Sequence, residues 1–130
     1  GTGTATDTTI DAGAIQYVGY NSGVGYATNT TVGGTQYVGG QNGTGYATST
    51  TVDSGGIQIV DSGGTATDTT VLSGGTASIL SGGVADAPVI SGGTLILDAG
   101  ASIGSGGIQF AAVSGANGGT LDLTGLGAFL

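Results

Sequence analysis

The chain lacks every basic side chain and also lacks cysteine, methionine, tryptophan and glutamate. Its only charged residues are eight aspartates, so the formal charge is −8. A chain of this kind has no electrostatic attraction to phosphate backbones or anionic lipid, which makes nucleic acid and membrane surfaces poor partners. Without cysteine there is no disulfide framework and no thiol chemistry.

Long hydrophobic runs are absent as well. A spanning helix needs about 18 consecutive apolar residues, and no stretch approaches that length, so we expect no direct membrane insertion of this segment. No signal peptide is visible, and Gly1 is not a natural start. We therefore expect a mature or excised segment of 130 residues that forms one domain or part of a longer repetitive one.

Glycine, in contrast, is abundant and accompanies a sequence repeat. It supplies 31 of the 130 residues, more than three times its usual share of about 7%, which indicates many tight turns. A first motif recurs as TATDTTI, YATNTTV, YATSTTV, TATDTTV and the degenerate VADAPVI. Its alanines are spaced by 22, 20, 19 and 19 residues: Ala5, Ala27, Ala47, Ala66 and Ala85. The basic unit is thus nineteen residues long.

A second motif (IQYV, TQYV, IQIV, TASI, TLIL) follows each copy of the first, and glycine-rich turns, most often Ser-Gly-Gly, separate the two. Short segments rich in threonine, valine and isoleucine between glycines are typical of strands, and no 3.6-residue period indicates a helix. Strands this short bury a core only by stacking in register, about 4.8 Å apart. The sequence therefore predicts a parallel β-solenoid of about nineteen residues per coil.

The side chains that face the core follow from residue type and parity. The columns headed by Ala5, Ile10 and Val18 stay apolar in every copy, so we expect them inside the solenoid. Five positions separate Ala5 from Ile10, and this odd number requires a bend at the column of Asp7 and its counterparts. The column headed by Gln16 holds Ala77 and Leu95 in later copies, which predicts a buried glutamine ladder. We infer three short strands per coil.

The periodicity changes along the chain. Residues 1–98 form regular nineteen-residue repeats, whereas residues 99–130 have half-coils of unequal length and an apolar end. That end contains Leu121, Leu123, Leu126, Phe129 and Leu130. We expect irregular C-terminal coils of the same solenoid there.

The motifs GGTATDTTV (63–71) and GGTQYV (33–38), with the recurring SGG, resemble the repeats of self-associating autotransporter adhesins, the AIDA-like and TibA-like group. The resemblance covers about residues 1–98 and implies a right-handed parallel β-helix displayed outside the cell on a bacterial surface. It implies homotypic association, biofilm formation and adherence to host cells or their surface glycans. It also implies O-glycosylation by a heptosyltransferase on the serines that precede Gly-Gly: Ser54, Ser62, Ser73, Ser81, Ser91 and Ser105.

A repetitive solenoid can have functions other than adhesion. Some polysaccharide lyases and hydrolases are β-helices, but their chemistry requires paired carboxylates or a cationic base with a metal, and only scattered aspartates are present. The calcium-binding nonapeptide spacing is absent too. We therefore expect neither an enzyme nor a cofactor. Ice binding through stacked Thr-x-Thr pairs, such as Thr28 and Thr30, and an extracellular filament or matrix subunit remain as alternatives.

The tyrosines are the most distinctive residues predicted to be exposed. Parity places Tyr17 over Tyr37 and Tyr26 over Tyr46, with Tyr20 in a loop. They form either a cross-coil aromatic ladder that strengthens the stack or a contact strip for sugars or proteins. The sequons at Asn29 and Asn42 are interpreted as accidental.

Overall fold

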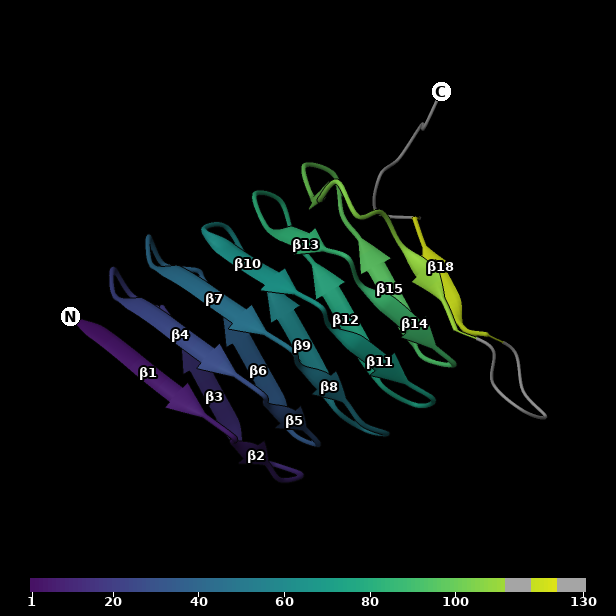
Figure 1. The fold of residues 1–130 in the computed structure, drawn as a ribbon. Coiled ribbons are helices and arrows are strands. Elements are labelled where there is room, and N and C mark those ends of the chain that lie inside the picture. The colour runs from purple at the N-terminus through teal and green to yellow at the C-terminus, as the bar shows by residue number, and fades with distance from the viewer. Residues whose placement is uncertain (112–117, 124–130) are drawn as a thin grey trace.

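The computed structural model describes residues 1–111 and 118–123. In these ranges the chain forms strands and turns and no helix, hence none that could span a membrane. The strands wind into stacked coils of three strands each (Figure 1). This confirms the all-β solenoid. We number the coils from the first strand, so that coil 1 holds β1 to β3, coil 2 holds β4 to β6, and so on.

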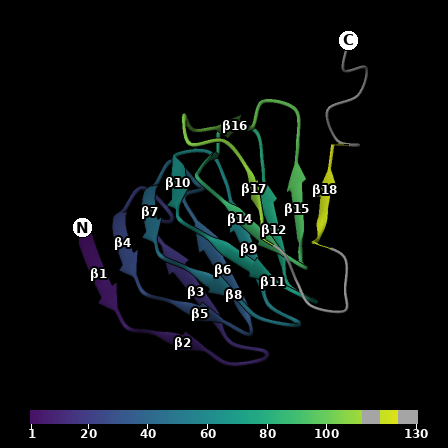
Figure 2. The ribbon, with the colours of Figure 1, turned by 45° about the vertical axis from the view of Figure 1, so that its right-hand side comes forward.

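Three parallel sheets run the length of the stack and form the sides of each coil (Figure 2). Sheet A contains β1 (Thr2–Thr6), β4 (Val24–Thr28), β7 (Thr44–Thr48), β10 (Gly64–Thr67), β13 (Val84–Asp86) and β16 (Ser102–Ile103). Sheet B contains β2 (Thr9–Ile10), β5 (Thr31–Val32), β8 (Thr51–Val52), β11 (Thr70–Leu72), β14 (Val89–Ser91) and β17 (Gln109–Phe110). Sheet C contains β3 (Ile15–Val18), β6 (Thr35–Val38), β9 (Ile57–Val60), β12 (Thr76–Ile79), β15 (Thr94–Leu97) and β18 (Thr120–Asp122).

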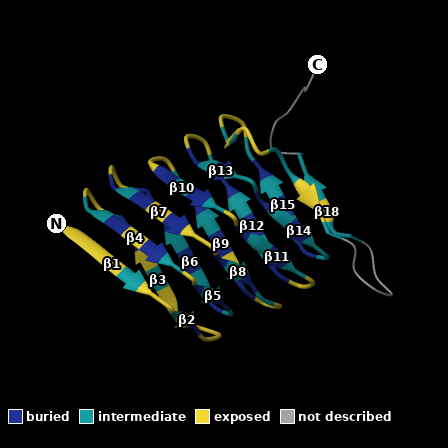
Figure 3. Cartoon of the chain, viewed as in Figure 1, coloured by how far each residue is buried: buried dark blue, intermediate teal, exposed yellow. Residues whose placement is uncertain are grey.

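The register pairs equivalent repeat positions. Ala5 lies opposite Ala27, and Val18 lies opposite Val38. The predicted inward columns are buried from coil 2 to coil 5. Figure 3 shows buried residues in dark blue alternating along the strands with more exposed ones. Val38, Val52 and Val60 are fully buried. Ala5 is the exception because coil 1 has a neighbouring coil on only one side, which leaves this alanine half-buried.

The predicted bend lies between sheets A and B. Asp7, Asn29, Ser49, Asp68 and Ala87 all have φ between 51° and 58°, a left-handed conformation in which asparagine and aspartate are favoured. This residue turns the chain, so the next residue points inward again. The threonines that follow it, Thr30, Thr50 and Thr69, are therefore in the core.

A ladder of glutamine amides crosses the core, as the sequence predicted. Gln36 Nε2 donates to Gln16 Oε1 at 2.8 Å, and Gln58 Nε2 donates to Gln36 Oε1 at 2.9 Å. Thr69 Oγ1 continues the chain by donating to Gln58 Oε1 at 3.1 Å. Gln36 and Gln58 are fully buried, so these bonds satisfy groups that water cannot reach.

The Gly-Gly turns are explained by stacking. In Ser73-Gly74-Gly75, Gly74 has a φ of +83°, and a Cβ on it would lie 2.5 Å from Ser54 Oγ of the previous coil. A Cβ on Gly75 would lie 2.6 Å from the carbonyl oxygen of Val52. The first glycine supplies a backbone conformation and the second allows close approach of two coils.

Beyond residue 98 the chain adds one more strand to each sheet, namely β16, β17 and β18. Leu121 and Leu123 are half-buried and pack against the core cluster. The predicted apolar end at Leu126, Phe129 and Leu130 lies outside the described residues.

Candidate functional site

Three of the five tyrosines cluster on the outer face of sheet C. Tyr17 and Tyr37 stack with ring centroids 5.2 Å apart and an interplanar angle of 11°. Tyr20, from the turn after β3, packs obliquely against them at 4.8 Å from Tyr17 and 6.5 Å from Tyr37. Tyr17 is 54% exposed, and the other two are half-buried.

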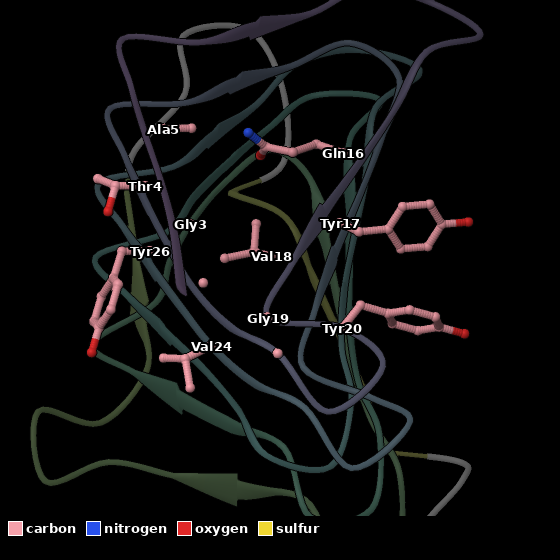
Figure 4. A pocket seen from close by; sticks show the side chains of 12 residues that line it. Gly3, Thr4, Ala5, Gln16, Tyr17, Val18, Gly19, Tyr20, Val24 and Tyr26 are labelled. Atoms are coloured by element: carbon pink, nitrogen blue, oxygen red, sulfur yellow. The ribbon is translucent and has the colours of Figure 1, made fainter. Parts of the chain in front are cut away.

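The remaining two tyrosines lie on sheet A. Tyr26 and Tyr46 stack with the same 5.2 Å spacing and an angle of 12°. Figure 4 shows Tyr26 on the opposite side of the coil from Tyr17 and Tyr20. The predicted contact strip is therefore divided into two clusters, because Tyr17 and Tyr37 belong to the second motif of the repeat and Tyr26 and Tyr46 to the first.

Stacking changes what these rings offer to a ligand. In each pair, the ring faces are turned toward the neighbouring coil, and the edges and hydroxyl groups point outward. A sugar that stacks on an aromatic side chain needs an open ring face. The paired geometry thus supports the reading of a cross-coil ladder, with ring edges left for contact with a partner.

The six serines that precede Gly-Gly lie at three different corners. Ser54 and Ser73 are exposed between sheets B and C, and Ser62 and Ser81 are exposed between sheets C and A. Ser91 is half-buried as the last residue of β14. Ser105 is exposed in the turn between β16 and β17, at the corner between sheets A and B. The six serines therefore form two short rows, Ser54 with Ser73 and Ser62 with Ser81, while Ser91 and Ser105 stand apart from these rows.

Polar residues line the corner between sheets A and B. Outward threonines form one column on each side of it, and the left-handed residues form a third column between them. Asn29 Nδ2 donates to Asp7 Oδ1 at 3.1 Å within that middle column. The threonine columns are Thr6, Thr28, Thr48 and Thr67 on sheet A, and Thr9, Thr31, Thr51 and Thr70 on sheet B.

The Thr-x-Thr pairs do not form a flat array. Thr28 faces outward and is half-buried, whereas Thr30 is 1% exposed. The left-handed residue between them turns one threonine out and the other in. This geometry disfavours the ice-binding alternative, which needs both threonines on one face.

A hollow of about 360 Å³ opens at coil 1, between β1, β3 and β4 (Figure 4). Its lining mixes inward residues such as Gln16 and Val18 with the rings of Tyr17, Tyr20 and Tyr26. Among the described residues, no group of three or more metal-binding side chains lies together. The hollow contains no carboxylate in its lining, so it lacks the acid–base groups that hydrolysis requires.

One surface was missed by the sequence interpretation. Ile15 and Ile57 lie on the outer face of sheet C and are 56% and 39% exposed. Ile59 is half-buried beside Tyr37 in the same register. The signal was available, because these isoleucines share the outward parity of Tyr17 and Tyr37.

The architecture defines a class of protein, the parallel β-solenoid with three sheets. A search among curated proteins finds no match. Residues 41–94 match the family model described as "Adhesin of bacterial autotransporter system, probable stalk" (AIDA). This region contains coils 3 and 4 and the first two strands of coil 5.

Among solved structures, the chain is similar to a fragment of TibA that was hyper-glycosylated by TibC. The TM-score is 0.67 and the sequence identity is 34%, over 92% of this chain and 48% of that chain. The chain thus spans about half the length of the TibA fragment. Together the two matches show that the chain is built of AIDA/TibA-like adhesin repeats. They support an autotransporter adhesin passenger and imply an extracellular or cell-surface location.

Proposed function

We propose that this segment is the repetitive part of a bacterial surface adhesin that associates with copies of itself and thereby promotes cell aggregation, biofilm formation and adherence. The observation that carries the proposal is the repetition itself. Equivalent outward positions stack in register from coil to coil, and several columns, such as the threonines of sheet B, keep one residue type over successive coils. The surface therefore presents columns of similar small contacts.

Columns of this kind favour multivalent binding. A single threonine, asparagine or tyrosine contact is weak, but once one coil is engaged the next contact forms at high effective concentration. Strong adhesion therefore needs no deep pocket. Adhesion through repeated weak contacts also needs no catalytic site, so we propose a structural role for the segment. The solenoid fold and the adhesin repeats support this role.

Charge sets the salt dependence of this association. A chain with a formal charge of −8 and no basic residue repels its own copies. At physiological ionic strength, salt largely screens this repulsion between charges more than about 8 Å apart, which is the Debye length. Association is therefore expected to strengthen between low and physiological salt.

The test is the aggregation of beads or cells that display the segment, measured at both salt concentrations. Beads carrying an unrelated acidic protein at equal density are the control for charge screening alone. The proposal fails if displayed segments neither aggregate nor adhere at either salt concentration, or if the control beads aggregate equally.

We also propose covalent glycosylation of the corner serines Ser54, Ser62, Ser73 and Ser81. Two observations support it: these hydroxyls are exposed at coil corners, and the similar TibA fragment carries sugars added by TibC. Ser91 is the least accessible candidate because it is half-buried in β14. Peptide mapping of protein from its native host is expected to find added mass on the four exposed serines. Sugar found only on threonine or asparagine would contradict the proposal.

A further inference from the structure

The outer face of sheet C differs from the other two faces in its chemistry. It presents Ile15, Tyr17, Tyr37, Ile57 and Ile59 over coils 1 to 3, and we call these five residues the sheet C patch. The outward residues of sheet B in the same coils are threonines, and those of sheet A are mostly threonine, together with Val24, Tyr26 and Tyr46.

Exposure of the patch is not confined to the first coil. Ile57 lies in coil 3, with β6 and β12 paired on either side of its strand, and is still 39% exposed. The sheet C patch therefore leaves apolar surface in contact with water on three successive coils. Contiguous apolar patches on a soluble chain mark interaction surfaces.

The distribution of charge indicates what covers this patch. The outward side chains of sheet C carry no carboxylate in coils 1 to 4, and the nearest aspartates lie at the flanking corners, namely Asp11 and Asp53 on one side and Asp61 on the other. Since the chain has no basic residue, two copies cannot attract each other by ion pairs at these corners. Contact between copies must therefore rely on apolar burial and hydrogen bonds. Tyr26 and Tyr46 are exposed on sheet A, but sheet C is the face on which exposed isoleucines lie beside a tyrosine stack.

We infer that the sheet C patch is the surface through which two copies of this chain dock, face to face. The inference rests on the proposed function and names the face that performs it. A two-fold axis near Thr35, which lies between Ile15 and Ile57 in register, would place coils 1 to 3 of one copy against coils 3 to 1 of the other. Such a contact keeps the polar corner between sheets A and B free, because that corner is opposite sheet C.

A matched pair of single variants tests the face. Thr35→Asp puts a carboxylate at the centre of the patch, and Thr31→Asp puts one at an outward, equally half-buried position on sheet B of the same coil. Both variants have one more negative charge than wild type. Like charges juxtaposed in an interface strongly disfavour association. Thr35→Asp should therefore raise the dimer dissociation constant about 100-fold or more, whereas Thr31→Asp should change it by only a few fold.

A second matched pair removes tyrosine stacks of equal geometry. Tyr17→Ser with Tyr37→Ser removes the stack on sheet C, and Tyr26→Ser with Tyr46→Ser removes the equivalent stack on sheet A. Both double variants lose one stacked pair, and the sheet C variant also loses the packing of Tyr20 against that pair. A difference in association is assigned to the face only when both variants have the same circular dichroism spectrum as wild type. The sheet C variant should raise the dimer dissociation constant about tenfold or more, and the sheet A variant should leave it nearly unchanged.

The dimer dissociation constant is measured by sedimentation equilibrium for wild type and the four variants, each as a 130-residue chain without glycosylation. The measurement covers a wide range of protein concentration and two salt concentrations. Circular dichroism spectra confirm that each variant is folded. The inference is overturned if wild type stays monomeric throughout, if Thr31→Asp dissociates the dimer as strongly as Thr35→Asp, or if the two tyrosine variants weaken it equally. If cells that display the Thr35→Asp variant still aggregate, sheet C is not the docking face, but the proposed adhesive function still holds. If the wild-type chain forms a dimer in solution but cells that display it do not aggregate, the docking face holds and the proposed function fails.

Discussion

The glutamine ladder is the feature whose energetic contribution can be tested most directly. Replacing Gln36 by leucine keeps a side chain of similar size in a column where Leu95 occurs naturally. The variant removes the acceptor of Gln58 Nε2 and the donor to Gln16 Oε1. Gln16 is half-buried at coil 1 and can turn to water, but Gln58 is fully buried and cannot.

The magnitude follows from that one unsatisfied amide. A buried donor without a partner costs about 1–3 kcal/mol, and the added apolar surface of leucine offsets part of this. We expect Gln36→Leu to lower the free energy of unfolding by about 1–2 kcal/mol. Adding Gln58→Leu removes the orphaned amide itself and leaves only the Thr69 hydroxyl without its acceptor.

The double variant is therefore expected to be more stable than Gln36→Leu alone, by up to about 1 kcal/mol, because one unpaired hydroxyl of Thr69 replaces the unpaired amide nitrogen of Gln58, which carries two donors. Urea unfolding followed by tyrosine fluorescence is the assay. All five tyrosines belong to coils 1 to 3 and so report on the coils that contain the ladder. The slope of the transition must stay constant for midpoints to be compared.

Additivity would refute this reasoning. If the double variant loses the sum of the two single-variant losses, the amides contribute independently and do not form a coupled ladder. A Gln36→Leu variant as stable as wild type would likewise contradict it, since Gln58 Nε2 would then have found another partner in the core.

Two further predictions concern the turns and the bend. Gly75→Ala should lower the free energy of unfolding by about 3 kcal/mol because the new Cβ meets the carbonyl oxygen of Val52. Gly13→Ala, at φ +84° with open space around it, should lower it by about 1 kcal/mol. Equal unfolding midpoints of the two variants in urea would contradict the stacking explanation. Asn29→Asp replaces an amide that donates to Asp7 Oδ1 by a second carboxylate, and should cost about 0.5–1 kcal/mol at low salt and less at high salt. A loss that is independent of salt would show that repulsion is not the cause.

The regular core could be predicted from the sequence in detail. Equivalent positions stack in a solenoid, so a column that stays apolar in five copies must face inward, and Val32, Val52 and Val71 do so. The glutamine ladder followed from the same logic, because alanine and leucine replace glutamine in later copies. The Gly-Gly pairs likewise predicted where the turns lie. The structure explains the second glycine of such a pair, as at Gly75, by the close approach of two coils.

The candidate surfaces were predicted less completely. Tyr17 over Tyr37 and Tyr26 over Tyr46 were paired correctly, yet the sequence interpretation grouped them as one strip. The exposed isoleucines, Ile15 and Ile57, passed as ordinary strand residues because a β-branched side chain fits either face of a strand.

By itself the sequence determined the repeat length, the columns and the register. Successive coils stack along one axis, so equivalent positions of the repeat become neighbours whatever the shape of the coil. Only the tertiary structure decided which column belongs to which face. The left-handed residue at Asn29 and its counterparts is the bend that the odd spacing predicted, and in the structure it turns Thr30 inward. The two motifs of the repeat form different sides of the coil, and for that reason the tyrosines divide between two sheets and the serines occupy separate corners.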